Sequence, residues 1–473
     1  MSPKFFMMVG LPASGKSYKA QELAKEYNAE IFSSDALREE LYNDVNNQEN
    51  NNDLFIELHR RIKECLKSGK SAIYDATNIS YKRRIAFLQE LKNIPCEKIC
   101  VLMATTYEEC LKRNTERERK VPEEVIKRMY MNFQCPHNFE GWNDIKVIYK
   151  DFVNKPQFNR SAFESMARYN MKNFNQNNPH HLYNVFDHSK ALMLQYPIGD
   201  IRRIAAILHD CMKKKAETVD GNGISHFYRH ENMSAYYVLT HPKIVNCCDY
   251  KTMLDIIFYI TYHMLAHNIT HQKTINKYKL IFGNTLYTSL IDFANKDKLA
   301  SKSVIFNNKK QNIYIVGGNY SVGYTRLGDM FIVDTEDVEK LLNYTWCVKN
   351  RQQGDDRLVS MTDGKMIFMH RLIMNIDDIK IAVDHINHIQ NDNRKKNLRL
   401  CSFMENSMNT SLSKNNTSGV NGVSQIKNGR YRAYINYNYK QIYLGCYDTL
   451  EEATEVRRQA SAQYYGEFAN LKI

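Results

Sequence analysis

The segment GLPASGKS, residues 10–17, has the residue types and spacing of a loop that grips phosphate groups. Gly10 and Gly15 would let backbone N–H groups approach phosphate oxygens without a Cβ in the way. The ammonium of Lys16 would lie against the β- and γ-phosphates of a nucleotide, and the hydroxyl of Ser17 would reach Mg²⁺. The segment therefore predicts a loop that binds ATP and Mg²⁺.

This loop is flanked by the elements that it needs. The apolar run FFMMVG before it is typical of a short buried strand, and residues 18–27 after it have helical composition. The N-terminus of a helix also carries a dipole that favours phosphate. Strand, glycine loop and helix in this order predict an α/β domain, which we expect to span residues 1–155.

Three later segments bear on the acceptor of the phosphoryl group: IFSSDALREEL, AIYDATNISYKRR and CLKRNTERERKVPEEVIKRMY. Together they resemble the phage-type polynucleotide 5′-kinases, a P-loop family. That family has an Asp with an Arg three residues later, a strand-end Asp before Thr-Asn, and an arginine-bearing lid before Val-Pro. The resemblance implies that Asp35 is the general base for a 5′-hydroxyl and that Arg38 holds the acceptor's phosphate. It also implies that Arg113 and Arg117 clamp the ATP phosphates.

Some assignments in this domain stay open. The family's segment lacks the Ala76 found here, so Asp75 and Asn78 could either contact the Mg²⁺–nucleotide or pack the end of a strand. We count Asp75 among the nucleotide-binding residues. Arg119 competes with Arg117 for the lid position, and the whole run ERERK could instead be a solvated helix end.

Residues 156–305 contain little glycine and show helical periodicity, which predicts an all-helical domain. Histidines and aspartates follow one another in the order H, HD, H, H, D, which resembles the HD phosphohydrolase superfamily. Imidazoles and carboxylates on facing helices can surround one or two transition-metal ions, which make hydroxide from bound water. By family analogy we expect Mn²⁺, Ni²⁺ or Fe²⁺. The metal ligands that the resemblance implies are His188, His209, Asp210, His230, His263 and Asp297.

Neighbouring residues offer alternatives to two of these ligands. Asp292 is a rival to Asp297, and His267 is a rival to His263. The pair at residues 180 and 181, both histidines, is expected at the surface or on the substrate's side. We also hypothesise that this domain is cut short, because nuclease-like sequence begins soon after its last aspartate.

A 5′-hydroxyl kinase joined to a metal phosphoesterase resembles bifunctional enzymes that heal nucleic-acid ends. The resemblance implies that the kinase adds a 5′-phosphate while its partner domain removes a 2′,3′-cyclic or 3′-phosphate from RNA or DNA ends. A separate ligase would then seal the strand. The alternative is a small-molecule or nucleotide kinase joined to a nucleotidase.

The segments FMHRLIM, VDHINHIQNDNRKKNLRL and ENSMN resemble the HNH endonucleases of the ββα-metal class, of the homing type. We expect this domain to span residues 306–412. The resemblance implies that Asp384 and Asn406 hold Mg²⁺ at the scissile phosphate while His385 activates water. Asn397 would brace the loop that orients His385. Outside this set, His370 and its neighbour Arg371 would be structural or would contact phosphate.

Residues 413–473 resemble the APETALA-type DNA-binding module, a small three-stranded sheet with one helix. Residues 391–440 carry nine basic and two acidic side chains, as expected for contact with double-stranded DNA. A period of two predicts that Arg430, Arg432, Tyr434 and Asn436 share the face that reads DNA. The alternative is that the HNH site does not cut and that the tail only tethers the chain to DNA.

The 473-residue chain is 43% hydrophobic and 25% charged, which is typical of a folded protein with several domains. No apolar run reaches the ~18 residues of a membrane span, so we expect no membrane partner. Eleven cysteines without a CxxC pair do not resemble a disulfide scaffold. We expect a cytoplasmic location, in the host cell if the gene belongs to a phage.

Overall fold

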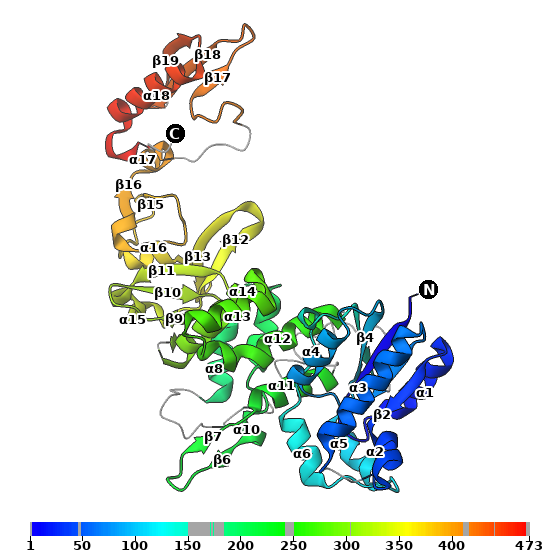
Figure 1. Cartoon of the computed structure of the whole chain (residues 1–473). Coiled ribbons are helices and arrows are strands. Elements are labelled where there is room, and N and C mark those ends of the chain that lie inside the picture. Colours follow the sequence, from blue (N-terminus) through cyan, green and yellow to red (C-terminus); the bar gives the residue numbers. More distant parts are fainter. Residues whose placement is uncertain are drawn as a thin grey trace. The chain divides into compact units, whose positions relative to one another are not determined.

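The computed structural model describes residues 2–45, 49–149, 171, 174, 184–241, 250–302, 304–409, 416–438 and 440–469. The chain divides into two compact units, Met1–Lys302 and Ser303–Ile473, each described here by itself (Figure 1). His180 and His181 lie outside the described residues. Within the described ranges, each helix is too short or too polar to cross a membrane.

The first unit begins with a five-stranded parallel sheet in the order β2-β3-β1-β4-β5 (blue to cyan in Figure 1). Its central strand carries the predicted run FFMMV, whose side chains are all buried, as in parallel sheets covered on both faces. The predicted order of strand, glycine loop and helix is confirmed. The strands are β1 (Lys4–Val9), β2 (Glu30–Ser33), β3 (Ala72–Asp75), β4 (Glu97–Met103) and β5 (Asp144–Ile148). The helices are α1 (Lys16–Tyr27), α2 (Ser34–Tyr42), α3 (Asn51–Lys67), α4 (Tyr81–Glu90), α5 (Tyr107–Thr115) and α6 (Glu123–Met131).

The rest of this unit, over the described residues 184–241 and 250–302, consists mainly of helices with one short hairpin of strands β6 and β7. Helix α12 packs against α9, α11 and α14. The hydroxyl of Tyr236 on α11 donates to the carbonyl oxygen of Thr105 at 2.6 Å, so the helical part contacts the end of the α/β part directly. The hairpin strands are β6 (Thr218–Val219) and β7 (Ser225–His226). The helices are α8 (Val185–Leu194), α9 (Ile201–Leu208), α10 (Lys213–Ala216), α11 (His230–Thr240), α12 (Tyr250–His267), α13 (Gln272–Phe282) and α14 (Asn284–Lys302).

The second unit begins with small antiparallel sheets around the fully buried Trp346. A four-stranded sheet has the order β11-β10-β9-β8, a three-stranded sheet has the order β12-β13-β14, and β15 pairs with β16 as a hairpin. The strands are β8 (Val304–Phe306), β9 (Ile313–Ile315), β10 (Tyr320–Tyr324), β11 (Met330–Asp334), β12 (Cys347–Asn350), β13 (Asp355–Thr362), β14 (Lys365–Phe368), β15 (Ala382–His385) and β16 (Leu398–Cys401). The helices are α15 (Val338–Leu341), α16 (Met369–Ile373) and α17 (Phe403–Met408).

The end of the second unit is a three-stranded antiparallel sheet covered by one helix (orange to red in Figure 1). Its elements are β17 (Val423–Gln425), β18 (Tyr431–Tyr437), β19 (Lys440–Tyr447) and α18 (Leu450–Tyr465). Helix α18 begins with a capping box in which Thr449 and Glu452 bond to each other's backbone N–H groups. The small core between helix and sheet includes Val423, Ala433 and Ala453.

Candidate active sites

The phosphate loop, residues 10–17, needs both of its outer glycines. A Cβ on Gly10 would lie 2.6 Å from the Ser14 hydroxyl, and Gly15 has a φ of +94°, a conformation that L side chains rarely adopt. The Nζ of Lys16 donates to the carbonyl oxygen of Leu11 at 2.7 Å. Burial lowers the pKa of this lysine. A desolvated ammonium at the start of α1 is well placed to bind phosphate oxygens.

Asp75 lies at the carboxyl end of β3, beside the phosphate loop. Burial raises its pKa, whereas a hydrogen bond from Ser17 and the charge of Lys16 oppose that rise. A carboxylate, a hydroxyl and an ammonium thus meet at one edge of the sheet, a suitable set for Mg²⁺ and a nucleotide. Asn78 instead donates its Nδ2 to the carbonyl oxygen of Met8 at 2.9 Å. The sequence left the roles of Asp75 and Asn78 open. In the structure Asp75 lies beside the phosphate loop, whereas Asn78 joins the segment after β3 to β1.

Asp35, in the first turn of α2, is held by two guanidinium groups. Arg38 Nη1 lies 3.0 Å from its Oδ1, and Arg119 Nη1 lies 2.6 Å from its Oδ2. Arg38 is nearly buried and also donates to Asn51 at 3.1 Å, whereas the side chain of Asp35 is 50% exposed. A fixed but accessible carboxylate can meet an incoming hydroxyl. The carboxylate of Asp35 is thus contacted by Arg119, whereas Arg117 is exposed and its charge acts on the ammonium of Lys16.

Arg113, on α5, lies against the phosphate loop. Its Nη1 would be 3.7 Å from a Cβ built on Gly15, and its Nε donates to Glu109 at 2.7 Å. Its Nη2 is buried and has no hydrogen-bond partner among the residues that the structure describes. A buried guanidinium donor without a partner is unfavourable by itself. Its position next to the loop fits the phosphates of a bound nucleotide.

The six predicted metal ligands of the helical part converge on one buried point. The Nε2 of His188 lies 2.9 Å from Oδ1 of Asp297, and the Nε2 of His230 lies 3.1 Å from Oδ1 of Asp210. The Nε2 atoms of His230 and His263 are 3.3 Å apart. We name these residues the imidazole–carboxylate cluster: His188, His209, Asp210, His230, His263 and Asp297. Two triads in it have ligand atoms within 4.8 Å of one another: His188, His209 and Asp297, and also His209, Asp210 and His263.

Backbone carbonyl groups orient the imidazoles of this cluster. Three of the rings direct Nδ1 at the carbonyl oxygen three residues earlier in the chain. If Nδ1 carries the proton, Nε2 presents its lone pair to the centre of the cluster, as in metal-binding histidines. The Nδ1 to oxygen distances are 2.7 Å for His209 and Ala206, 2.7 Å for His230 and Phe227, and 2.8 Å for His263 and Ile260.

Electrostatics also favour a cation at the centre. Although burial opposes it, the charges of His209 and Lys213 hold the pKa of Asp210 well below its usual range, and those of His209 and His188 do so for Asp297. Burial and neighbouring imidazoles lower the pKa of His263. Apart from ion-pair contacts, both oxygens of Asp210 and one of Asp297 accept no hydrogen bond among the described residues. Burial alone would lower the pKa of His209, but the charges of Asp210 and Asp297 outweigh it and raise that pKa. A transition metal would take the place of the proton, since imidazole lone pairs and ionised carboxylates form a donor set for such an ion.

The rival residues take other positions. Asp292 is paired with basic side chains elsewhere. The Nε2–H of His267 donates to Oδ2 of Asp297 at 2.9 Å, whereas His188 and His209 face Oδ1 of that residue. Sequence reasoning missed Lys213, whose Nζ lies 2.7 Å from Oδ2 of Asp210. Its spacing of three residues after Asp210 was the signal that could have found it.

Asp384 and His385 end strand β15 and are both buried. The Nε2 of His385 lies 3.2 Å from Oδ1 of Asn393, and burial lowers the pKa of this histidine. Asn397 accepts the backbone N–H of Asn387, in the loop after β15, at 3.0 Å and donates to the carbonyl oxygen of Asp392 at 2.8 Å. These two hydrogen bonds fix the loop that contains Asn393, the partner of His385. This is the loop that Asn397 was expected to brace.

The partners of Asp384 differ from the predicted ones. The amide of Asn409 donates to both oxygens of Asp384, at 3.1 and 2.9 Å, whereas Asn406 is exposed on α17. The physical reason is that Asn409 lies at the C-terminal cap of α17, a helix that packs against β15. Arg399, directly opposite on β16, contacts Oδ2 of Asp384 through Nε at 2.8 Å and Nη2 at 2.7 Å.

The two residues at the start of α16 have separate roles. The ring of His370 is buried 5.3 Å from the ring of His385, and burial lowers its pKa to about 3. Arg371 donates to the carbonyl oxygens of Ile381 and Asp378, both at 2.7 Å. Arg371 is therefore a structural residue that joins α16 to the approach of β15.

The predicted DNA-reading face lies on β18 and the residue before it. The intervening Ala433 and Ile435 are buried, so the alternation of strand faces agrees with the prediction. Opposite positions 433 and 434 the register shifts, which leaves Leu444 of β19 as the extra residue of a bulge. The residues of the predicted face are exposed or half-buried: Arg430, Arg432, Tyr434 and Asn436.

Two comparisons concern the sequence. A family model described as an AAA domain matches residues 5–136. The L-seryl-tRNA(Sec) kinase of Methanococcus maripaludis is 30% identical over 178 residues, which are 35% of this chain and 66% of that protein. An uncharacterized HNH endonuclease, L560, of Acanthamoeba polyphaga mimivirus is 34% identical over 116 residues, 24% of this chain and 59% of that protein. The chain thus spans less than two thirds of each curated relative.

Solved structures give weaker likenesses. A protein of Chloroflexus aurantiacus described as a kinase matches with a TM-score of 0.27 and 16% identity, over 32% of this chain and 90% of that one. A chain of the Pnkp1/Rnl/Hen1 RNA repair complex matches with a TM-score of 0.24 and 22% identity, over 28% and 43%. Family match, parallel sheet and phosphate loop together make the N-terminal part a kinase-like P-loop domain, which implies ATP and Mg²⁺.

Proposed function

We propose that this chain is an end-healing enzyme joined to an HNH endonuclease. Its first unit would phosphorylate 5′-hydroxyl ends of RNA or DNA and would remove 2′,3′-cyclic or 3′-phosphates. Its second unit would bind and cut double-stranded DNA. The observation that carries the proposal is that an accessible carboxylate, Asp35, and a six-membered imidazole–carboxylate cluster occur in one compact unit with a phosphate loop.

In the kinase reaction, bound ATP supplies the phosphoryl group and Mg²⁺ neutralises its charge. Lys16 and Arg113 would bind the phosphates, and Ser17 with Asp75 would hold the metal ion. Asp35 would accept the proton of the attacking hydroxyl, because it is ionisable, exposed and fixed in orientation by two arginines. By sequence resemblance, Arg38 would hold the acceptor's phosphate and Arg117 would belong to the lid.

In the hydrolase reaction, one or two transition-metal ions would supply a bound hydroxide. The six cluster residues would hold them, since their Nε2 and carboxylate atoms face a common buried point. Lys213 would orient Asp210 and balance its charge. His267 would fix Asp297 from behind, as outer-shell partners of metal ligands do.

In the second unit, Asp384 and an asparagine would hold Mg²⁺ while His385 accepts a proton from water. Because an asparagine amide can rotate by 180°, the Oδ1 of Asn409 can face the position that its Nδ2 faces here. His385 is suited to the role of base because burial keeps its imidazole neutral. Arg430, Arg432, Tyr434 and Asn436 would contact DNA. The mimivirus relative supports a nuclease in the second unit, although the match covers only 59% of that protein's length.

The decisive experiment offers the full chain one substrate with both kinds of damage. An oligoribonucleotide with a 5′-hydroxyl and a 2′,3′-cyclic phosphate is incubated with labelled ATP, Mg²⁺ and Mn²⁺. We expect label at the 5′ end that is lost in Lys16→Ala and Asp35→Asn, and loss of the cyclic phosphate that stops in Asp210→Asn. Transfer of label to no strand of RNA or DNA would reject the proposal for the first unit.

A second candidate for the kinase site is phosphorylation of a hydroxyl on an aminoacylated tRNA or on a small molecule. The relative from Methanococcus maripaludis favours it, because that protein's name describes a seryl-tRNA kinase. Seryl-tRNA, free nucleosides and 5′-hydroxyl strands offered in parallel separate these acceptors. For the second unit, supercoiled DNA with Mg²⁺ separates a nuclease from a tether, since nicking lost in His385→Ala indicates cutting.

A further inference from the structure

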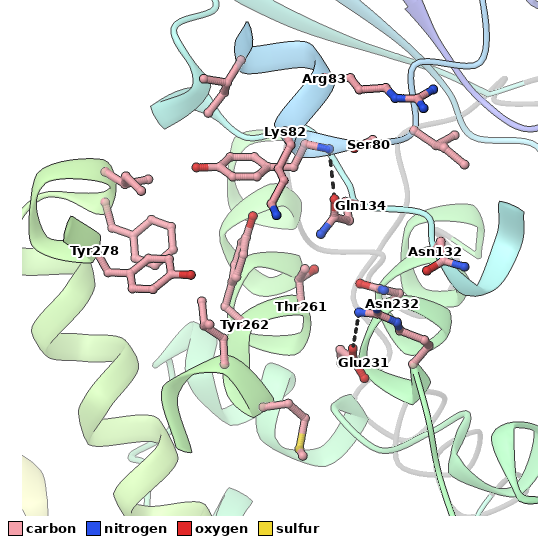
Figure 2. A pocket seen from close by; sticks show the side chains of 18 of the residues that line it. Ser80, Lys82, Arg83, Asn132, Gln134, Glu231, Asn232, Thr261, Tyr262 and Tyr278 are labelled. Atoms are coloured by element: carbon pink, nitrogen blue, oxygen red, sulfur yellow. Dashed lines mark hydrogen bonds and ion pairs between the residues drawn. The ribbon is translucent and has the colours of Figure 1, made fainter. Parts of the chain in front are cut away.

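A pocket of about 930 Å³ lies within the first unit and belongs to neither candidate active site (Figure 2). The start of α4, the end of α6 and helices α11, α12 and α13 contribute its walls. Its kinase-side wall includes Ile79 and Ser80, which follow the strand end at Asp75 by four and five residues. One wall of the pocket thus begins only four residues along the chain from the carboxylate that lies beside the phosphate loop.

Two buried hydroxyls in this pocket lack partners. Thr261 and Tyr262 are 5% and 7% exposed, and both line the pocket. Neither Thr261 Oγ1 nor Tyr262 Oη has a hydrogen-bond partner among the described residues. Figure 2 shows the hydroxyls of Tyr262 and Tyr278 and the ammonium of Lys82 pointing into the same space. Buried hydroxyls are normally hydrogen-bonded, so these point to a ligand with polar groups.

The pocket also offers aromatic surface and positive charge. Phe282 stacks on Tyr278 with ring centroids 5.4 Å apart and contacts Tyr262 at 5.1 Å, which gives a continuous aromatic wall. The ionisable residues described along the walls are four cations and one carboxylate: Lys82, Arg83, Arg229, Lys277 and Glu231. The carboxylate of Glu231 already lies 4.0 Å from Arg229. Aromatic rings that alternate with cations are the usual surface for stacked bases and their phosphates.

We propose that this pocket binds a single-stranded stretch of the polynucleotide whose end the kinase site phosphorylates. The inference rests on the proposed kinase function and adds to it the place where nucleotides beyond the terminal one are held. Bases would stack on Tyr278 and its neighbouring rings, phosphates would meet Lys82 and Lys277, and the hydroxyls of Thr261 and Tyr262 would bond to base edges or sugar hydroxyls. Its volume is at the upper end for small-ligand sites, which suits more than one nucleotide.

Acceptor length is the measurement that tests this. The full chain phosphorylates a nucleoside 3′-phosphate and longer 5′-hydroxyl oligonucleotides, as RNA and as DNA of one sequence. We expect Tyr278→Ala to raise KM for the longer acceptors by about 5- to 100-fold, and Lys277→Ala to raise it less. KM for ATP, KM for the nucleoside 3′-phosphate and kcat should not change. Tyr278→Phe, which keeps the ring, should restore most of the binding.

A matched control is available on the same helix. Lys273 is exposed on α13 and does not line the pocket, so Lys273→Ala removes an equal charge and should leave every KM unchanged. An equal effect of Lys273→Ala and Lys277→Ala would mean that any positive charge on α13 strengthens acceptor binding, whether or not it lines the pocket. That result would overturn the proposal. The proposal would also be overturned by a Tyr278→Ala variant that thermal denaturation shows to be folded and that binds acceptors of every length as the wild type does.

Photo-crosslinking tests whether a nucleic-acid strand occupies the pocket, independently of catalysis. A strand that carries 5-iodouridine is irradiated with the full chain, and crosslinked peptides are mapped by mass spectrometry. We expect crosslinks to the α12 and α13 peptides that contain Tyr262 and Tyr278, and their loss with Tyr278→Ala. If the wild type phosphorylates no strand, the kinase proposal fails while the crosslink still tests the pocket. Phosphorylation without these crosslinks and without a change in KM overturns the pocket alone.

Discussion

The imidazole–carboxylate cluster of the first unit and the Asp384–His385 hairpin of the second surround their carboxylates with different groups. In the cluster, Asp210 and Asp297 are buried opposite imidazole Nε2 atoms, with Lys213 as the nearby cation. In the hairpin, Asp384 is already held by the guanidinium of Arg399 and the amide of Asn409. Both regions have a buried aspartate beside a buried histidine, yet the charge that balances the aspartate differs.

The difference concerns what a metal ion must displace. An ion entering the cluster meets lone pairs that face one another, and it relieves the cost of burying carboxylates near each other. An ion entering the hairpin must compete for Oδ2 of Asp384 with two N–H groups of Arg399. We therefore expect the cluster to retain its metal through purification, and we expect the hairpin to bind Mg²⁺ weakly and reversibly.

The largest predicted effect is that of Asp210→Asn. An amide cannot supply the negative charge that Asp210 contributes to its triad with His209 and His263. Metal should therefore be lost and phosphate hydrolysis should fall by roughly 10³-fold or more, because water without a metal keeps its high pKa. Metal content by mass spectrometry and release of the cyclic phosphate are measured together. Kinase activity serves as the internal control. Full metal content in the variant would contradict the prediction, since the cluster would then not depend on this carboxylate.

Next in size is the pair Asn409→Ala and Asn406→Ala in the hairpin. Asn409 contacts Asp384 and Asn406 does not, so only the first change should slow plasmid nicking, by roughly 10- to 100-fold. The measurement is the rate of conversion of supercoiled to open DNA at fixed Mg²⁺. The reverse order of effects would mean that α17 extends or rotates on DNA and that Asn406 is the ligand after all.

This pair also marks what the sequence could not predict. Both asparagines follow the DH segment at similar spacing, and which of them meets Asp384 depends on where α17 ends. Arg399 was not predicted either, because its place opposite Asp384 depends on the register of β15 and β16 across the long intervening loop. The periodicity of a sequence predicts which residues share one face of a strand or helix, but it does not predict how two strands or helices align with each other.

Other parts were more accessible to sequence reasoning. The run FFMMVG and the glycine loop predicted β1, the phosphate loop and α1, because these rules act between adjacent residues. The six cluster residues come from five separate helical segments, and their order could be recognised only through a family resemblance. The hairpin β6–β7 and the pocket at α13 had no such signal, since the pocket arises where distant segments pack together.

Burial lowers the pKa of both histidines at this site, His385 of the hairpin and His370 of the adjacent α16, which favours their neutral forms. Burial lowers the pKa of His370 to about 3, against about 6.5 in an unfolded chain. Above pH 6.5 neither state binds the proton. As pH falls below 6.5 only the unfolded state does, so the second unit should lose about 2 kcal/mol of stability by pH 5. Unfolding is followed by the fluorescence of Trp346 in a Trp142→Phe background. His370→Gln should flatten this dependence, and an unchanged slope would exclude His370 as its source.

The smallest predicted effect, that of Arg399→Gln, tests the cause of the difference most directly. If the guanidinium is what Mg²⁺ must displace from Asp384, its removal should tighten binding of Mn²⁺, used as the probe, by about 5-fold, the value of a modest ion pair. Mn²⁺ binding is measured by electron paramagnetic resonance in the Asp210→Asn background, so that the cluster does not contribute. Arg458→Gln, which breaks the exposed Arg458–Glu455 pair on α18, is the control and should change nothing. Weaker binding in Arg399→Gln would mean that the arginine positions Asp384 for the ion, and the two regions would then differ in affinity for a reason other than competition.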